Sequence, residues 1–146
     1  MIDDEVSAMD LLQAEVYRQR YLADQIETAS PEQRLLMLFA QLLADLDEAA
    51  EAFADRDIET INNSLQHAQQ ILFALRDPLD RETPLGLALS STYTFCLNSL
   101  VQANLQKNPR ELPRVQEMLG AIAAANRTAA AEVLARGRAG EFEGVA

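Results

Sequence analysis

The chain is 146 residues long with a formal net charge of -11 at pH 7 and 49% hydrophobic residues, which suits a single domain with a substantial core. One cysteine and one histidine exclude a disulfide framework and a Cys/His-rich metal site, so we expect no metal and no cofactor. Residues 1–60 hold 15 acidic and 4 basic side chains, against 8 and 8 in residues 61–146, and this acidic first half disfavours nucleic-acid binding.

Helical periodicity runs through the chain, and no segment alternates as a strand would. In chain order we predict helices over residues 4–25, 31–55, 58–76 and 85–107, and a last helix that begins near Pro109 or Pro113 and ends near Arg136. Four long helices with short loops predict an all-α fold, an antiparallel four-helix bundle with an additional N-terminal helical segment. We assign residues 1–29 to the N-terminal segment, 30–136 to the bundle and 137–146 to a disordered tail.

Two of these helices begin with a capping signal. Ser30 can cap the 31–55 helix, with Pro31 in its first position and Gln33 as the third member of a capping box. Asp57 can cap the helix that follows.

The 31–55 helix is apolar on more than one side. Its predicted core face consists of Leu35, Leu38, Phe39, Leu42, Leu46, Ala49 and Phe53. Leu36 and Leu43 lie on the flank of that face, and Met37 points nearly opposite. An exposed leucine forgoes roughly 1.5–3 kcal/mol of burial. Either this helix is therefore buried on two sides, one of them against the N-terminal segment, or it presents a partner-binding surface.

The later helices have one apolar face each. For the 58–76 helix this face is Ile58, Ile61, Leu65, Ala68, Ile71, Leu72 and Leu75; for the last helix it is Val115, Met118, Leu119, Ile122, Ala129 and Val133. The many alanines of the last helix keep it slim, which predicts a groove beside it. In the 85–107 helix the face is Leu89, Tyr93, Cys96, Leu97, Leu100 and Asn104. Phe95 projects away from that face, as an anchor for a partner does. Asn104 needs hydrogen-bond partners among apolar neighbours, which favours a structural role.

Chemistry-bearing residues are few, and they assemble no active site. His67 lies off the apolar face of its helix and is expected to be exposed; a histidine phosphotransfer domain is an alternative, but no Lys or Gly accompanies it. Cys96 has no basic neighbour to activate it, which indicates a core residue. No apolar run approaches the ~18 residues of a membrane span. The acidic start is unlike a signal peptide, so we expect a cytoplasmic protein that is not an enzyme and does not insert into a membrane.

Taken together, three motifs resemble those of the flagellar export chaperone FliS family. Tyr21 followed after six residues by Thr28-Ala-Ser-Pro31 resembles the family's Y-x6-TASP start, and LLMLF stands at its L-x-x-M-L-Y. LQHAQQILFALRDPLD (65–80) and LSSTYTFCLNSLVQAN (89–104) are similar to its A-Q and A-N motifs. The likeness covers roughly residues 17–126, with Thr92 in place of a Leu, Phe39 and Phe95 in place of tyrosines, and Asn126 where the family often has a Trp.

The resemblance implies a bundle that binds the disordered C-terminal segment of flagellin in the bacterial cytosol. Covering that segment prevents premature polymerisation before flagellar type III secretion, and components of the export apparatus are further expected partners. A FliS-like adaptor for another client remains an alternative. The predicted partner-binding residues are Tyr21, Ile26, Leu36, Met37, Leu43, Tyr93, Phe95 and Asn104. Of these, Tyr21 and Ile26 are expected to lie over part of the surface when no client is bound.

Overall fold

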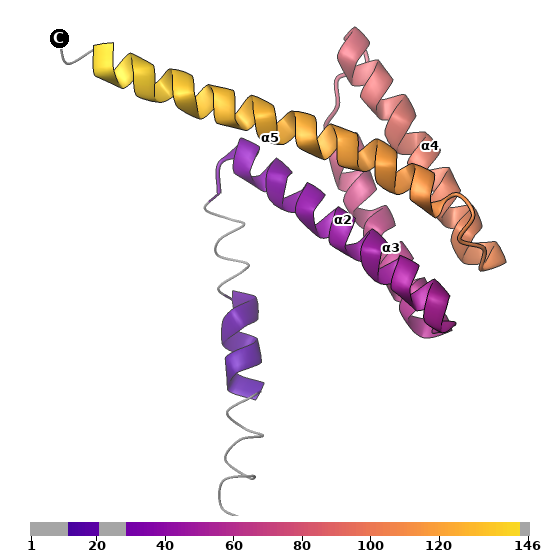
Figure 1. Ribbon diagram of the computed structural model, residues 1–146. Coiled ribbons are helices and arrows are strands. Elements are labelled where there is room, and N and C mark those ends of the chain that lie inside the picture. Colours follow the sequence, from indigo (N-terminus) through magenta and orange to yellow (C-terminus); the bar gives the residue numbers. More distant parts are fainter. Residues whose placement is uncertain (1–11, 21–28, 144–146) are drawn as a thin grey trace, which may run out of the picture. The chain divides into compact units, whose positions relative to one another are not determined.

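The computed structural model describes residues 12–20 and 29–143, with side chains described as far as residue 137. The chain divides into two compact units, Met1–Arg34 and Leu35–Ala146. In the first unit residues 12–20 form a helix; the rest of the predicted 4–25 helix lies outside the described residues. The four long helices, labelled in Figure 1, are α2 (Pro31–Asp55), α3 (Ile58–Arg76), α4 (Pro84–Gln106) and α5 (Leu112–Glu143). They confirm the predicted all-α fold.

Pairs of side chains show that neighbouring helices run antiparallel. Between α3 and α4, the Asn104 amide nitrogen donates to Asn62 Oδ1 at 3.0 Å, and Arg76 Nη1 donates to Thr94 Oγ1 at 3.3 Å. The start of α3 therefore lies beside the end of α4. Only two residues separate α2 from α3, so these helices also run antiparallel, and His67 of α3 is hydrogen-bonded through Nδ1 to Asp45 of α2.

The predicted helix starts are present. Gln33 N–H donates to Ser30 Oγ at 3.2 Å, and Ser30 N–H donates to Gln33 Oε1 at 3.0 Å, which completes the capping box. Asp57 accepts from Thr60 N–H at 3.2 Å and from Thr60 Oγ1 at 2.6 Å, and these bonds lower the pKa of the Asp57 carboxyl. The start of α4 has a cap that was not predicted from the sequence, Thr83, which accepts from Gly86 N–H at 3.0 Å.

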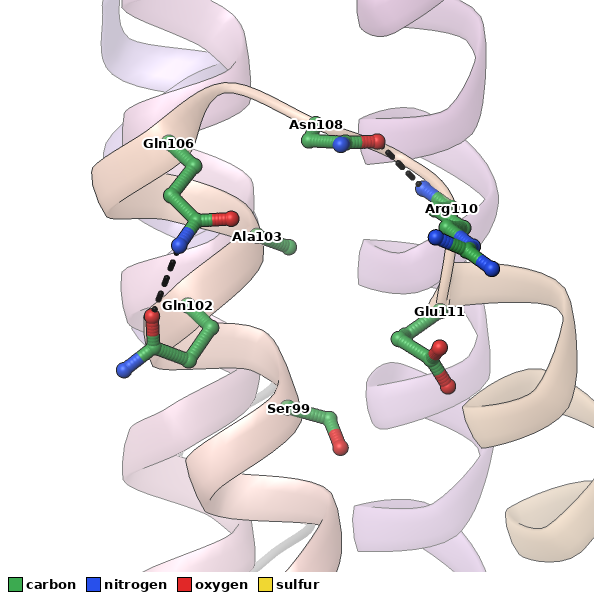
Figure 2. Close-up of a pocket in the computed structure, with 7 residues that line it drawn as sticks. All are labelled: Ser99, Gln102, Ala103, Gln106, Asn108, Arg110 and Glu111. Carbon is green, nitrogen blue, oxygen red and sulfur yellow. Dashed lines mark hydrogen bonds between the residues drawn. The ribbon is translucent and has the colours of Figure 1, made fainter.

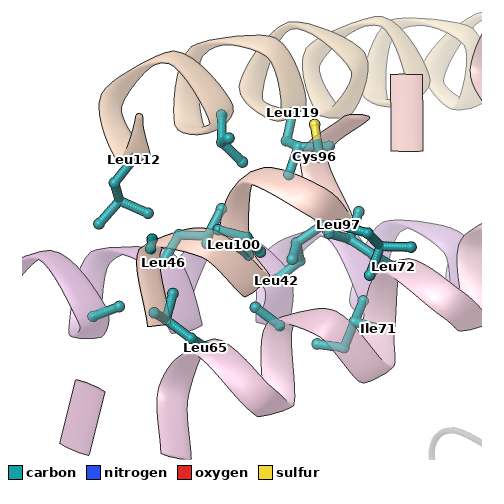
Figure 3. Close-up of a cluster of buried hydrophobic side chains, with 14 of the residues drawn as sticks. Leu42, Leu46, Leu65, Ile71, Leu72, Cys96, Leu97, Leu100, Leu112 and Leu119 are labelled. Carbon is teal, nitrogen blue, oxygen red and sulfur yellow. The ribbon is translucent and has the colours of Figure 1, made fainter. Parts of the chain in front are cut away.

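All four long helices contribute leucines to one core (Figure 3). Leu42 and Leu46 come from α2, Leu65 and Leu72 from α3, Leu97 and Leu100 from α4, and Leu112 and Leu119 from α5. Cys96 is fully buried, as predicted, and burial raises the pKa of its thiol to about 11.

Three expectations about helix ends and faces are wrong. The last helix runs to Glu143 rather than ending near Arg136. Val133, predicted to be on its buried face, is 58% exposed, and Ala129 is exposed as well. Gln116 of α5 is bonded to Asp47 of α2. The second unit begins at Leu35, which in an antiparallel pair of helices is level with Thr128 of α5. Val133 lies beyond that level, where this part of α2 does not cover it.

Ile58 is exposed for a similar reason. It lies four residues before Asn62, whose partner in α4 is Asn104. Ile58 is therefore level with a position beyond the end of α4 at Gln106, where no turn of that helix remains to cover it.

Candidate functional site

The first turns of α5 lie between α2 and α4, and contacts on both sides fix them there. On one side Gln116 Nε2 donates to Asp47 Oδ1 of α2 at 3.0 Å. On the other, the Arg114 guanidinium lies 5.2 Å from the ring centroid of Phe95 of α4. The start of α5 therefore has two flanks, each with a pocket.

The α2–α5 pocket is mostly apolar and has a volume of about 280 Å³. It is lined by Ala50, Phe53, Ala54, Pro109, Leu112, Pro113 and Gln116. Leu36, Leu43 and Ala50 follow one another at intervals of seven residues, which places them on one side of α2. All three are half-buried. They form a row about 21 Å long that ends at the pocket.

The α4–α5 pocket is lined by both polar and apolar atoms and has a volume of about 220 Å³ (Figure 2). Ser99, Gln102, Ala103 and Gln106 of α4 line it together with Asn108, Arg110 and Glu111 of the following turn. It lies one turn of α4 beyond Phe95, so an aromatic ring and a mixed pocket follow each other along this flank.

The turn that shapes this second pocket is held by several bonds. Lys107 ends α4 with a φ of 49°, a left-handed conformation that costs a non-glycine residue ~1 kcal/mol. Its backbone N–H donates to Ala103 O, and so does that of Asn108, at 3.1 Å. Its ammonium group donates to Asn104 Oδ1. Arg110 N–H donates to Asn108 Oδ1 at 3.0 Å.

The residues predicted from the sequence fall on different parts of this arrangement. Leu36 and Leu43 share the α2 flank, whereas Phe95 lies on the α4 flank and is 38% exposed. Met37 is half-buried, about 100° around α2 from Leu36, and so lies off the row. Tyr21 and Ile26 lie outside the described residues.

Two further predicted residues are held inside the bundle. Tyr93 is 3% exposed, and its ring centroid lies 6.5 Å from that of Phe39. Asn104 is half-buried and bonded to Asn62 and Lys107, which confirms that it finds polar partners. In this conformation both residues are held by contacts within the bundle.

Most residues that line the two pockets were not predicted from the sequence, and neither was Asp45. From the sequence, Pro109 and Pro113 were interpreted only as residues that begin or interrupt helices. Because proline has a fixed φ angle, two prolines around a short turn also predict a rigid turn, and both line the α2–α5 pocket. Asp45 is buried, accepts from Gln41 Nε2 at 2.9 Å and is bonded to His67. His67 itself is half exposed, as expected for a residue off the apolar face.

Within residues 12–20 and 29–143, no helix combines the length and the apolar character that crossing a membrane requires. The same residues bring together no group of three or more side chains suited to hold a metal ion. The start of α5 is flanked by the two pockets described above.

Comparisons with known proteins identify the family of this chain. The family model of flagellar protein FliS matches residues 13–133, which include all the residues of both pockets. A flagellar secretion chaperone FliS of Bacillus subtilis (strain 168) is 31% identical over 96 residues, 66% of this chain and 72% of the relative. A flagellar secretion chaperone FliS of Vibrio cholerae serotype O1 is 28% identical over 113 residues, 76% of this chain and 83% of the relative. With most of its length matched by the family model, the chain belongs to the FliS family.

Proposed function

We propose that this protein is an export chaperone that binds the C-terminal segment of flagellin in the bacterial cytosol. Binding keeps that segment from polymerising prematurely and holds it competent for flagellar type III secretion. The observation that carries the proposal is the row of Leu36, Leu43 and Ala50 that ends at the α2–α5 pocket, in a member of the FliS family. Both relatives are named flagellar secretion chaperones.

The two flanks fit a client that is disordered when free. Such a client loses conformational entropy on binding, and it offsets that loss by burying apolar side chains over a long surface. The α2 row is about 21 Å long, the length of about fourteen residues of a client helix. Side chains at a spacing of three or four residues on that helix would meet Leu36 and Leu43, and one would enter the pocket beside Phe53.

The α4 flank offers a different kind of contact. Phe95 supplies an aromatic anchor, with the Arg114 guanidinium over its ring. The α4–α5 pocket next to it offers amide, hydroxyl, guanidinium and carboxylate groups. Those groups suit the exposed backbone and polar side chains of an unfolded segment. An apolar flank and a mixed flank on either side of α5 would let one client segment bind across the start of that helix.

In this proposal the protein acts by binding and not by catalysis. Tyr21 and Ile26 keep their proposed role as partner-binding residues ahead of α2. Components of the flagellar export apparatus are proposed as later partners, because a secretion chaperone must deliver its client.

Isothermal titration with flagellin from the same organism tests the proposal, using intact flagellin and flagellin without its C-terminal segment. We expect binding to intact flagellin that disappears on truncation, together with inhibition of filament assembly at equimolar chaperone. Equal binding to both forms would place the site elsewhere on the client. No binding to either form would refute flagellin as the client and favour the alternative of a FliS-like adaptor for another protein.

A further inference from the structure

The turn between α4 and α5 is basic in a chain that is acidic overall. Residues 107–114 hold three basic side chains and one acidic side chain, whereas residues 1–60 hold 15 acidic and 4 basic ones. Charges at a protein surface act over about 10 Å at ordinary salt, so an anionic group that approaches this protein is favoured at the turn and repelled by the first part of the chain. The α4–α5 pocket lies at this turn.

Two of the three cations at the turn are already engaged by α4. The Lys107 ammonium group donates to a side-chain oxygen of that helix, and the Arg114 guanidinium lies over the Phe95 ring. Arg110, the third cation, is exposed and lines the pocket. Among the residues that the structure describes, its guanidinium forms no ion pair with a carboxylate. Arg110 therefore keeps its charge and its N–H groups available for an anion.

Neutral donors accompany Arg110 in the pocket. Figure 2 shows Gln102 and Gln106 on the α4 side and Arg110 on the side of the turn. The Gln106 amide nitrogen donates to Gln102 Oε1 at 3.2 Å, and this bond leaves the amide nitrogen of Gln102 as a donor. The Ser99 hydroxyl lines the same pocket. An arginine with amide and hydroxyl donors around it suits a carboxylate, because each carboxylate oxygen accepts more than one hydrogen bond.

The size and shape of the pocket suit the end of a chain. Its volume of about 220 Å³ is below the roughly 300–1,000 Å³ of sites for small molecules. The turn that contains Asn108, Arg110 and Glu111 closes it on one side (Figure 2). A client that continued past the pocket would meet this turn. A client that ends there places its terminal carboxylate, and the last carbonyl groups that no helix bond satisfies, among the donors.

We propose that the α4–α5 pocket binds the C-terminal α-carboxylate of the client, with Arg110 as its principal partner. This assignment, which rests on the proposed function, gives the client a direction: its last residue lies in the α4–α5 pocket, and the residues before it lie on the α2 flank. Crossing the start of α5, a helix about 10 Å across, takes about three extended residues. Glu111 is the one acidic side chain in the lining, and its carboxylate opposes that of the client.

Isothermal titration of the full chain against two synthetic peptides tests the proposal. Both peptides have the sequence of the C-terminal segment of flagellin from the same organism, one with a free terminal carboxylate and one with a terminal carboxamide. The amide should bind about fivefold more weakly, which is the size expected for the loss of an exposed ion pair. Added salt should reduce this difference, because it screens the charge of the carboxylate.

Three variants locate the contact. Arg110→Gln should lower the affinity for the free acid about fivefold and change that for the amide by less than about twofold. Glu111→Gln should raise the affinity for the free acid about twofold, because it removes a repulsive charge, and leave that for the amide unchanged. Arg127→Gln is the matched control: it removes the same charge as Arg110→Gln from an exposed position about 24 Å along α5 from Glu111, well beyond the range of about 10 Å over which surface charges act. It should bind both peptides like the unmodified chain.

Other results overturn the proposal, and they separate it from the proposed function. Equal affinity of the unmodified chain for the acid and the amide excludes recognition of the chain end and leaves flagellin as the client. A loss in Arg110→Gln that is the same for both peptides shows that Arg110 binds another part of the client, such as an acidic side chain. A loss in Arg127→Gln as large as that in Arg110→Gln assigns the effect to overall charge. Binding of neither peptide refutes the proposed function and, with it, this pocket assignment.

Discussion

Replacing Gly86 by alanine should destabilise the bundle, although alanine is the better helix former. Gly86 is buried in the first turn of α4, and a Cβ there would lie 1.8 Å from the carbonyl oxygen of Asp80 and 2.7 Å from Thr83 Oγ1. Neither atom can move freely, because Thr83 Oγ1 donates to Asp80 O at 2.9 Å and accepts from Gly86 N–H at 3.0 Å. The added methyl group must therefore push the preceding loop away or break the cap.

The magnitude follows from three contributions. Overpacking costs typically 1–3 kcal/mol, so we take about 2. Loss of the Thr83 cap costs about 1 kcal/mol, and the better helix propensity of alanine returns about 1. We expect Gly86→Ala to lower the free energy of unfolding by about 2 kcal/mol. Gly120→Ala is the control: apart from the neighbouring backbone of its own helix, no described atom lies within 4 Å of a Cβ there, so it should raise that free energy by about 0.5–1 kcal/mol.

Urea unfolding followed by circular dichroism at 222 nm measures both values. With a slope of about 1.5 kcal/mol per molar urea, the midpoint should fall by about 1.3 M for Gly86→Ala and rise by about 0.5 M for Gly120→Ala. Two results would refute the predicted clash of a Cβ at Gly86 with Asp80 and Thr83. One is a change of the same sign in both variants, and the other is a midpoint for Gly86→Ala within about 0.3 M of that of the unmodified chain.

Three further predictions concern buried polar groups. His67→Ala leaves the buried Asp45 carboxylate without its imidazole partner and should lower the free energy of unfolding by about 1–3 kcal/mol, whereas Asp45→Asn in the His67→Ala background should recover part of the loss in urea melts. Asn104→Ala and Asn62→Ala should show a coupling free energy of about 0.5–1.5 kcal/mol in a double-mutant cycle, and additivity would exclude the bond between them. The thiol of Cys96, with its pKa raised to about 11, should react with iodoacetamide at pH 8 only after unfolding; fast labelling of the native chain would contradict its burial.

Much of the fold follows from local signals in the sequence. The capping box at Ser30 and the cap at Asp57 place two helix starts, because each depends only on neighbouring residues. The 3.6-residue period identifies the core leucines for the same reason. Helix ends were harder: α5 continues past Arg136 because alanine, arginine and glutamate favour helix enough to include Gly137.

The site depends on distances that no local pattern contains. Leu36 and Phe95 both stand out in the sequence as surplus apolar residues, but only the structure places them on opposite flanks of α5. Tyr93 looks like a binding residue in its motif, yet it packs against Phe39 in the core. The Asp45–His67 pair joins residues 22 positions apart and could not be read from either helix alone.

The most direct test of the central claim is the affinity for flagellin of variants on the two flanks of α5. Leu36→Glu and Phe95→Glu, each shown to be folded by circular dichroism, should bind intact flagellin at least about tenfold more weakly in isothermal titration, which corresponds to about 1.4 kcal/mol. Leu85→Glu, which changes an exposed leucine outside the flanks, should bind like the unmodified chain. Unchanged affinity in both flank variants would contradict the assignment of the client to the two sides of α5.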